Sequence, residues 1–311
     1  MFQIFANTIL PIFSLVLIGF LLRLKDIIAP AYIKTSNQIV FNVAIPAMLF
    51  SEICRAPFHE NFSLAAVLCI LGALGGIALV ALILTWTLKI PETRRGTFLQ
   101  SSFHGNIGYI SYAVAYYALG ESHFALMAIL GSFLMLAQNI LAVWALAGFR
   151  NDPLRKDEKI VFWKLIFQNP IILAVAAGIL YSASALPLPM PIMKSLEILS
   201  GMAFPTALLL IGASLSFSSL RPMVKEITAI GVLKLVALPL LGYALMSWQQ
   251  LPASLMLPGI ILLAAPPATV TYIMAAQLGG NPELAATSVS LHTLLSALSY
   301  SMILAAFLGA K

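Results

Sequence analysis

The two halves of this chain carry prolines at matching positions, 159 residues apart. Pro11 corresponds to Pro170 and Pro46 to Pro205, since 170 − 11 = 159 and 205 − 46 = 159. A constant offset across most of a chain indicates two copies of one structural unit. We expect these four prolines chiefly to shape the helices in which they lie.

Composition restricts the environment of these two units. The 311 residues are 61% apolar and 9% charged, against about 25% charged in an ordinary soluble domain. The apolar stretches reach the ~20 residues that a spanning helix needs, and the alternating short strands of a membrane barrel are absent from the sequence. We therefore predict an all-α polytopic membrane protein that contacts the lipid bilayer. The net charge of +6 is assigned to loops between spans and not to a nucleic-acid interface.

Hydropathy predicts ten spanning helices, five in each unit. We expect residues 1–149 to form the first repeat, 150–164 a polar cytoplasmic linker, and 165–311 the second repeat. The expected helices cover 4–22, 33–53, 62–88, 95–119, 122–148, 165–184, 192–217, 225–247, 252–277 and 284–309.

Basic residues predict which side of the membrane each loop faces. Thirteen of the 17 Lys and Arg residues lie in one set of loops, and the opposite set holds Arg55, Lys194 and Lys311. The basic side is therefore expected to be cytoplasmic, with both termini outside a bacterial cytoplasmic (inner) membrane. Because five is an odd number, the second repeat enters from the opposite side, and the repeats are inverted.

The fourth and ninth predicted helices are interrupted near mid-membrane. The fourth contains GNIG at residues 105–108, and the ninth contains Pro266 and Pro267, with 266 − 107 = 159. Glycine weakens a helix by about 1 kcal/mol, and proline removes a backbone donor. Non-helical backbone at this depth is tolerated only inside protein or beside a watery cavity. We expect the two breaks to cross and to present positive helix N-termini to a small anion such as a carboxylate.

Ionisable residues inside predicted spans are costly, about 2.5–3.5 kcal/mol on insertion scales, and mark functional sites. Lys234 in the eighth helix could neutralise an anionic substrate or helix ends, or it could pair with carbonyl groups or reach the surface. His104, one turn before the first break, and His292 in the tenth helix are candidates for proton transfer. Glu52 is expected near the outer surface.

Amide side chains in the second and fifth helices have alternative interpretations. Asn37, Gln38 and Asn42 favour interhelical hydrogen bonding, and Gln138 and Asn139 fit either a wet lining or interhelical contact. No aspartate lies in any predicted span. This disfavours a carboxylate sodium site and leaves proton coupling, a carbonyl sodium site, or flux driven by the membrane potential. We expect no cofactor and no bound metal.

Seven motifs follow one another along the chain: LPIF at 10–13, LIGFLLR at 17–23, VFNVAIPAMLF at 40–50, GNIG at 105–108, QNPII at 168–172, PTALLLIGASL at 205–215 and PPATVTYIMA at 266–275. In order and spacing they resemble the motifs of the auxin efflux carrier family, which includes bacterial malonate and malate permeases. The resemblance covers nearly the whole chain, although each motif alone is weak. The chain departs from the family where Thr269, Val270 and Thr271 replace an asparagine common in relatives, and where the third helix lacks a charged residue.

This resemblance implies a fold like that of sodium/proton antiporters and bile-acid symporters, with helices 4 and 9 broken and crossing. Helices 1, 2, 6 and 7 would form a scaffold that also makes a homodimer, and helices 3–5 and 8–10 would form a mobile transport domain. It implies that the substrate carboxylate binds at the crossover. The expected substrate-binding residues are His104, Gly105, Asn106, Gly108, Tyr109, Lys234, Pro266, Pro267, Thr269 and Thr271.

The sequence thus predicts a non-enzymatic secondary carrier for small organic anions, mono- or dicarboxylates, that works by elevator-like alternating access. Asn106 would hydrogen-bond the carboxylate, Tyr109, Thr269 and Thr271 would line the pocket, and Lys234 would support anion affinity. A membrane sensor that binds the anion without moving it, or a cation-coupled symporter of a larger anion, stay as alternatives. An intramembrane enzyme is disfavoured, because no catalytic pair is visible at matching depth.

Overall fold

The computed structural model describes residues 5–56, 62–149, 168–184, 186, 188–217 and 220–308. Within these residues the fold is helical, and the pairing of Gly105 with Pro267 is the one β-bridge. Seven of the described helices are long and apolar enough to cross a membrane. They are Phe5–Leu24, Pro30–Arg55, Leu64–Thr87, Phe124–Ala147, Met190–Ala213, Arg221–Trp248 and Pro282–Leu308. The chain is therefore a polytopic helical membrane protein.

The other three expected spans coincide with shorter apolar helices, Ile107–Leu119, Pro170–Ser184 and Ala253–Leu263. Two of these flank the predicted breaks. The third is the expected sixth helix, whose first residues lie outside the described part of the chain, as does the linker expected at 150–164. The count of ten spans therefore stays a prediction.

The first half of the chain comprises the following elements: η1 Phe5–Ile9, α2 Leu10–Leu24, α3 Pro30–Ile39, η2 Val40–Ala44, α4 Ile45–Arg55, α6 Leu64–Thr87, α7 Glu92–Phe103, η3 Ile107–Ser111, α8 Tyr112–Leu119 and α9 Glu121–Ala147. The second half comprises α11 Pro170–Ser184, α12 Met190–Ser200, α13 Ala203–Ala213, η4 Arg221–Met223, α14 Val224–Gly231, η5 Val232–Ala237, α15 Leu238–Trp248, α16 Ala253–Leu263, α17 Val270–Gln277 and α18 Pro282–Leu308.

Prolines shape these helices in two ways. Pro11, Pro46 and Pro239 each stand two residues after a π-helical segment, η1, η2 or η5, and the helix continues through them. Proline leaves the carbonyl one turn earlier without its donor, and a π segment re-registers the backbone around that position. Pro170 and Pro205 instead lie in the first turns of α11 and α13, where a missing N–H is tolerated.

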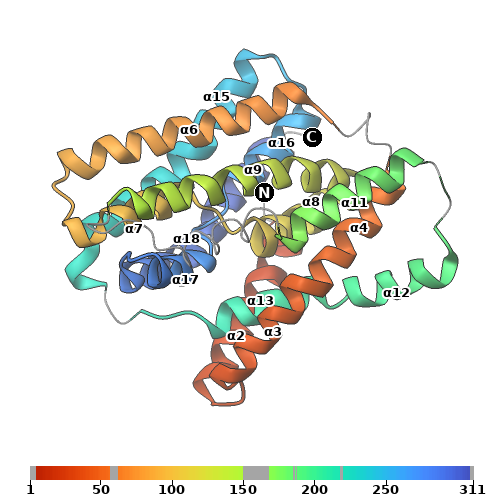
Figure 1. Ribbon diagram of the computed structural model, residues 1–311, viewed down its shortest axis with the longest axis horizontal. Helices are drawn as coiled ribbons and strands as arrows, with labels where there is room; N and C mark the ends of the chain where they lie inside the picture. The colour runs from red at the N-terminus through yellow and green to blue at the C-terminus, as the bar shows by residue number, and fades with distance from the viewer. Residues whose placement is uncertain are drawn as a thin grey trace.

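The helices pack in two sets (Figure 1). One set pairs α2 with α13 and α4 with α11, with α3 and α12 against them. The other set joins α6, α7, α9, α15, α16, α17 and α18. Figure 1 shows α6 and α15 on the opposite side of the molecule from α2, α3 and α12, with the broken helices between them.

Two close helix contacts in the first set are related by the same offset as the prolines. A β-carbon added at Gly19 would lie 2.0 Å from the carbonyl oxygen of Leu209, and one at Gly178 would lie 3.5 Å from that of Phe50. The partners obey 178 − 19 = 159 and 209 − 50 = 159. Gly19 thus allows α2 to touch α13 through the backbone, and Gly178 lets α11 approach α4, where the nearest atom is Cβ of Ile53 at 3.0 Å.

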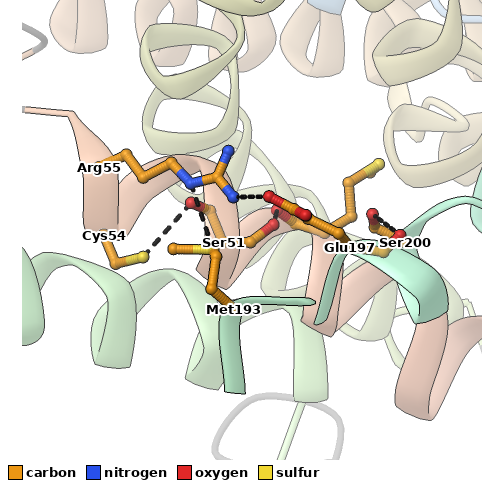
Figure 2. Close-up of polar contacts among 7 residues, drawn as sticks. Ser51, Cys54, Arg55, Met193, Glu197 and Ser200 are labelled. Carbon is orange, nitrogen blue, oxygen red and sulfur yellow. Dashed lines mark hydrogen bonds and ion pairs between the residues drawn. The ribbon is translucent and has the colours of Figure 1, made fainter. Parts of the chain in front are cut away.

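The exposed end of α4 is joined to α12 by polar contacts. The guanidinium of Arg55 pairs with the carboxylate of Glu197, and its Nε lies 3.2 Å from Sδ of Met193. Figure 2 shows these side chains meeting between the two helices, beside the hydrogen bond from Sγ of Cys54 to the carbonyl of Ser51. Both partners of the ion pair are exposed, so we expect it to orient α12 and to contribute little to stability.

Candidate functional site at the crossover of two broken helices

The two helix breaks lie against each other and form a short antiparallel bridge. The backbone N–H of Asn106 donates to the carbonyl of Pro266 at 2.8 Å, and that of Ala268 donates to the carbonyl of His104 at 2.9 Å. These two bonds flank the facing pair of Gly105 and Pro267. Segments 150 or more residues apart in the sequence therefore share one non-helical crossover.

The bridge explains why glycine and proline stand opposite each other. In this antiparallel pattern the facing residues do not use their own N–H groups across the pair, so Pro267 loses no hydrogen bond there. Their backbones also approach closely. A β-carbon at Gly105 would lie 2.8 Å from Cβ of Ala265 and 3.0 Å from Nζ of Lys234, which leaves no room for a side chain.

Four half-helix ends converge on the crossover. α7 ends at Phe103 and α16 ends at Leu263, whereas η3 begins at Ile107 and α17 begins at Val270. The sequence led us to expect positive N-termini here, and the structure adds the negative C-termini of α7 and α16. The crossover therefore presents both signs of helix dipole within one buried volume.

Lys234 places a positive charge at the negative end of α16. Its Nζ donates a 2.7 Å hydrogen bond to the carbonyl of Leu263, in the last turn of α16. The side chain is 1% exposed and comes from the π segment η5. The sequence left three environments open for Lys234. The structure shows it buried, at the C-terminal end of α16 and bonded to a carbonyl group, and not at the surface.

Asn106 offers the group best suited to an anion. The residue is buried, and its main-chain carbonyl lies 3.2 Å from the N–H of Ile110 and 3.3 Å from that of Ser111, from which it accepts hydrogen bonds. Its side-chain Nδ2 has no hydrogen-bond partner among the described residues. A buried donor without a partner costs about 1–3 kcal/mol, and a carboxylate oxygen is a strong acceptor for such a donor.

The other predicted site residues divide between the crossover and its surroundings. Tyr109 donates from its hydroxyl to Oδ1 of Asn37 in α3 at 3.2 Å, so it links η3 to the first set of helices. A β-carbon at Gly108 would lie 3.2 Å from Cδ1 of Ile171. The Thr271 hydroxyl donates to the carbonyl of Ala268 at 2.6 Å, so part of its hydrogen-bonding capacity is already used within the break.

Thr269 and the candidate proton carriers lie in different environments. Thr269 is half-buried at the start of α17, where its hydroxyl makes no capping hydrogen bond. His104 is buried in the crossover, with Nδ1 3.5 Å from Nε2 of Gln100. His292 is buried on α18 against Gly231 of α14, and Glu52 is half-buried near the end of α4.

The sequence allowed two roles for Gln138, in a wet lining or in interhelical contact. The structure shows it buried on α9, with Oε1 accepting from the N–H of Gly105 and Nε2 donating to the carbonyl of Gly105, both at 3.0 Å. The signal in the sequence was a polar residue in an apolar helix, but its partner lies 33 residues away. The crossover therefore has a third polar component besides the two broken helices.

An ion pair joins the first turns of α7 and α14, and the sequence did not predict it. The guanidinium of Arg94 lies 2.9 Å from Oε1 of Glu226 and 3.0 Å from the carbonyl of Pro222. The Glu226 carboxylate is 6% exposed and the Arg94 side chain 23%. The pair anchors the start of the first broken helix to the segment that carries Lys234.

We expect Arg94→Gln to lower the melting temperature of the purified protein, because it leaves the Glu226 carboxylate buried without its charged partner. Breaking a fully buried pair costs about 3–5 kcal/mol. We expect a smaller loss here, because the Arg94 side chain is 23% exposed and water reaches it. Arg23→Gln is the control, since Arg23 pairs at 3.3 Å with an Asp26 side chain that is 91% exposed. Equal melting temperatures for the two variants in detergent would contradict the anchoring role of Arg94.

The known proteins that this chain resembles are described as transport proteins. A family model described as "membrane transport protein" matches residues 4–304. The chain is 29% identical over 310 residues to a Rhizobium meliloti (strain 1021) protein provisionally named a malonate transporter, covering 94% of this chain and 92% of that protein. It is 24% identical over 302 residues to an uncharacterized transporter of Methanothermobacter thermautotrophicus (strain Delta H), covering 94% and 95% of the two chains. A further uncharacterized transporter, from Methanocaldococcus jannaschii, is 25% identical over 221 residues, 69% of this chain and 70% of that one.

Proposed function

Because the chain belongs to the auxin efflux carrier family of membrane transport proteins, we propose that it is a secondary transporter of small organic anions. The substrates we propose are mono- or dicarboxylates such as malonate or malate. The name of the Rhizobium meliloti relative supports this choice of substrate class. The membrane we propose is a bacterial cytoplasmic membrane, with both termini outside.

The observation that carries this proposal is Nδ2 of Asn106 at the crossover, which has no hydrogen-bond partner in the part of the chain that the structure describes. It stands next to Gly105, whose backbone packs against the Lys234 ammonium, and directly before the N-terminus of η3. A hydrogen-bond donor, a buried cation and a positive helix end are the three groups that stabilise a carboxylate. The binding role of this site is our inference from that geometry.

The packing supports an elevator-like motion of one helix set against the other. In this proposal the set around α2, α4, α11 and α13 is the scaffold and dimer interface, and the set carrying the crossover is the transport domain. The contacts of Gly19 and Gly178, which obey the 159-residue offset, support two inverted five-helix repeats. Gly120 and Gly279, at the same offset, both have φ = 77°, which adds to that support. Coupling to a proton or a sodium ion is open within this proposal.

We expect Asn106→Ala to lower carboxylate uptake into proteoliposomes at least about tenfold, because a hydrogen bond to a charged group contributes roughly 1.5–3 kcal/mol. Asn42→Ala is the matched control, since the Asn42 side chain is exposed and bonds within its own helix, to the carbonyl of Gln38 at 2.7 Å. Malonate, malate and monocarboxylates are each assayed. Unchanged uptake of every accepted substrate by well-folded Asn106→Ala would refute the proposed site.

The same preparation separates the alternatives. A sensor would bind the anion, seen as a thermal shift, and would show no flux in proteoliposomes. A cation-coupled symporter of a larger anion would ignore small carboxylates and would require an imposed sodium or proton gradient. Uptake of a small carboxylate that is accelerated by substrate on the opposite side supports the carrier.

A further inference from the structure

We propose that Gln138 is a positioning residue that keeps the first crossover segment extended, and that transport depends on both hydrogen bonds of its amide. This inference rests on the proposed transport function, which supplies the reason why the crossover must keep its shape. It concerns a residue on α9, outside the two broken helices that form the candidate site.

The backbone of residues 104–106 behaves as a short strand with two polar edges. The carbonyl of His104 and the N–H of Asn106 point to the second broken helix and bond with Ala268 and Pro266. The N–H and carbonyl of Gly105 point the other way, as alternation along an extended chain requires. In a sheet, another strand would satisfy that second edge.

Gln138 takes the place of that missing strand. Its amide presents one acceptor and one donor in a plane, and both are used, each at 3.0 Å from Gly105. The side chain is 3% exposed, so water does not readily replace it. Without these bonds, the buried N–H of Gly105 would lack a partner, at about 1–3 kcal/mol, and the carbonyl of Gly105 would keep only the hydrogen bond from the N–H of Ile107 at 2.9 Å. The segment would then open more often, which would move Asn106 from its present position.

The break in the second half of the chain, at Pro266 and Pro267, does not need a residue equivalent to Gln138. Pro267, which faces Gly105, has no N–H to satisfy on its outer edge. At the 159-residue offset, Gln138 corresponds to Ala297 in α18, since 138 + 159 = 297, and alanine has no amide to offer. The amide is therefore specific to the glycine break, which is the break that carries Asn106.

Glutamate at position 138 makes this proposal testable. A protonated Glu side chain offers one O–H donor and one carbonyl acceptor, which can replace the two bonds that the glutamine amide makes to Gly105, whereas an ionised one has only acceptors and repels the carbonyl of Gly105. We therefore expect Gln138→Glu to take up carboxylate at least tenfold more slowly than the unmodified protein at pH 8, and to recover most of that loss at pH 5. Gln138→Leu, which keeps volume and lacks both bonds, should be slow at every pH.

The comparison is made against the unmodified protein at each pH, because His104 and Lys234 adjoin Gly105 in both proteins. Asn139→Asp is the matched control. It adds the same charge to the same buried helix, but about 100° around the axis from Gln138. Carboxylate uptake by Asn139→Asp should not recover at pH 5. Backbone amide hydrogen exchange of residues 104–111 in detergent is measured in parallel, and it needs no substrate.

The two measurements separate this proposal from the transport proposal. Faster exchange at residues 104–111 in Gln138→Glu at pH 8 but not at pH 5, relative to the unmodified protein, supports the positioning role even if the unmodified protein transports no carboxylate tested. A Gln138→Glu defect in uptake and exchange that is the same at every pH, or no defect in either variant, would overturn it.

Discussion

Lys234→Met is expected to raise the substrate concentration that gives half-maximal uptake by roughly 10- to 150-fold, the equivalent of about 1.5–3 kcal/mol for a hydrogen bond to a charged group. The ammonium lies against Gly105, one residue from Asn106, and donates to the end of α16 at Leu263. Without it, a bound carboxylate would face the negative ends of α7 and α16 with no buried cation to offset them.

Methionine is chosen because it is unbranched and close to lysine in length, and because it removes the charge and the hydrogen-bond donor together. A buried lysine costs about 2.5–3.5 kcal/mol on insertion scales, so the loss of one hydrogen bond to Leu263 should not unfold the variant. Lys225→Met is the control, since Lys225 is exposed and bonds to the carbonyl of Leu88. Uptake measured over a range of malonate concentrations at constant ionic strength provides the test. Unchanged affinity and maximal rate would remove Lys234 from the site.

Gly212→Ala is expected to lower the stability of the folded protein by forcing two helices apart. A β-carbon at this position would lie 1.8 Å from the carbonyl oxygen of Val16 and 2.8 Å from the backbone nitrogen of Phe20. Both obstacles are backbone atoms of α2, so no side-chain rotation makes room, and α2 and α13 must separate. Overpacking costs about 1–3 kcal/mol or more, which corresponds to a fall in melting temperature of roughly 2–12 °C at ~2–4 °C per kcal/mol.

Gly75→Ala carries the same chemical change without the obstacle, because a β-carbon there meets no atom within 4 Å. Alanine also favours a helix over glycine by about 1 kcal/mol, so this control should be as stable as the unmodified protein or more stable. Melting temperatures in one detergent, with size-exclusion profiles, compare the two. Similar stability of both variants would mean that α2 and α13 do not depend on backbone contact.

Much of the helical architecture could be predicted because its causes are local. Long apolar stretches predicted the seven long helices, since the bilayer accepts no unsatisfied backbone. The breaks at residues 105–108 and at Pro266 and Pro267 were also predicted, because glycine and proline act on their own backbone. The placement of both breaks within one crossover followed from the repeat, which is likewise a property of the sequence.

The partners of individual polar side chains could not be predicted in the same way. Gln138 had two interpretations, and only its position on α9 beside Gly105 decided between them. Glu226 stands 132 residues from Arg94, and neither residue marks the other in the sequence. Tyr109 was expected to line the pocket, and its hydroxyl bonds to Asn37 in α3.

The sequence by itself thus determined a helical membrane protein of duplicated pattern, its two helix breaks and its resemblance to a family of carriers. These follow from hydrophobicity, from the backbone limits of glycine and proline, and from the repeated order of motifs. Only the tertiary structure decided that Lys234 bonds to the last turn of α16, that Gln138 bonds to the glycine break, and that Nδ2 of Asn106 has no partner among the described residues. Such relations depend on where distant segments meet, and the packing of the whole chain sets those positions.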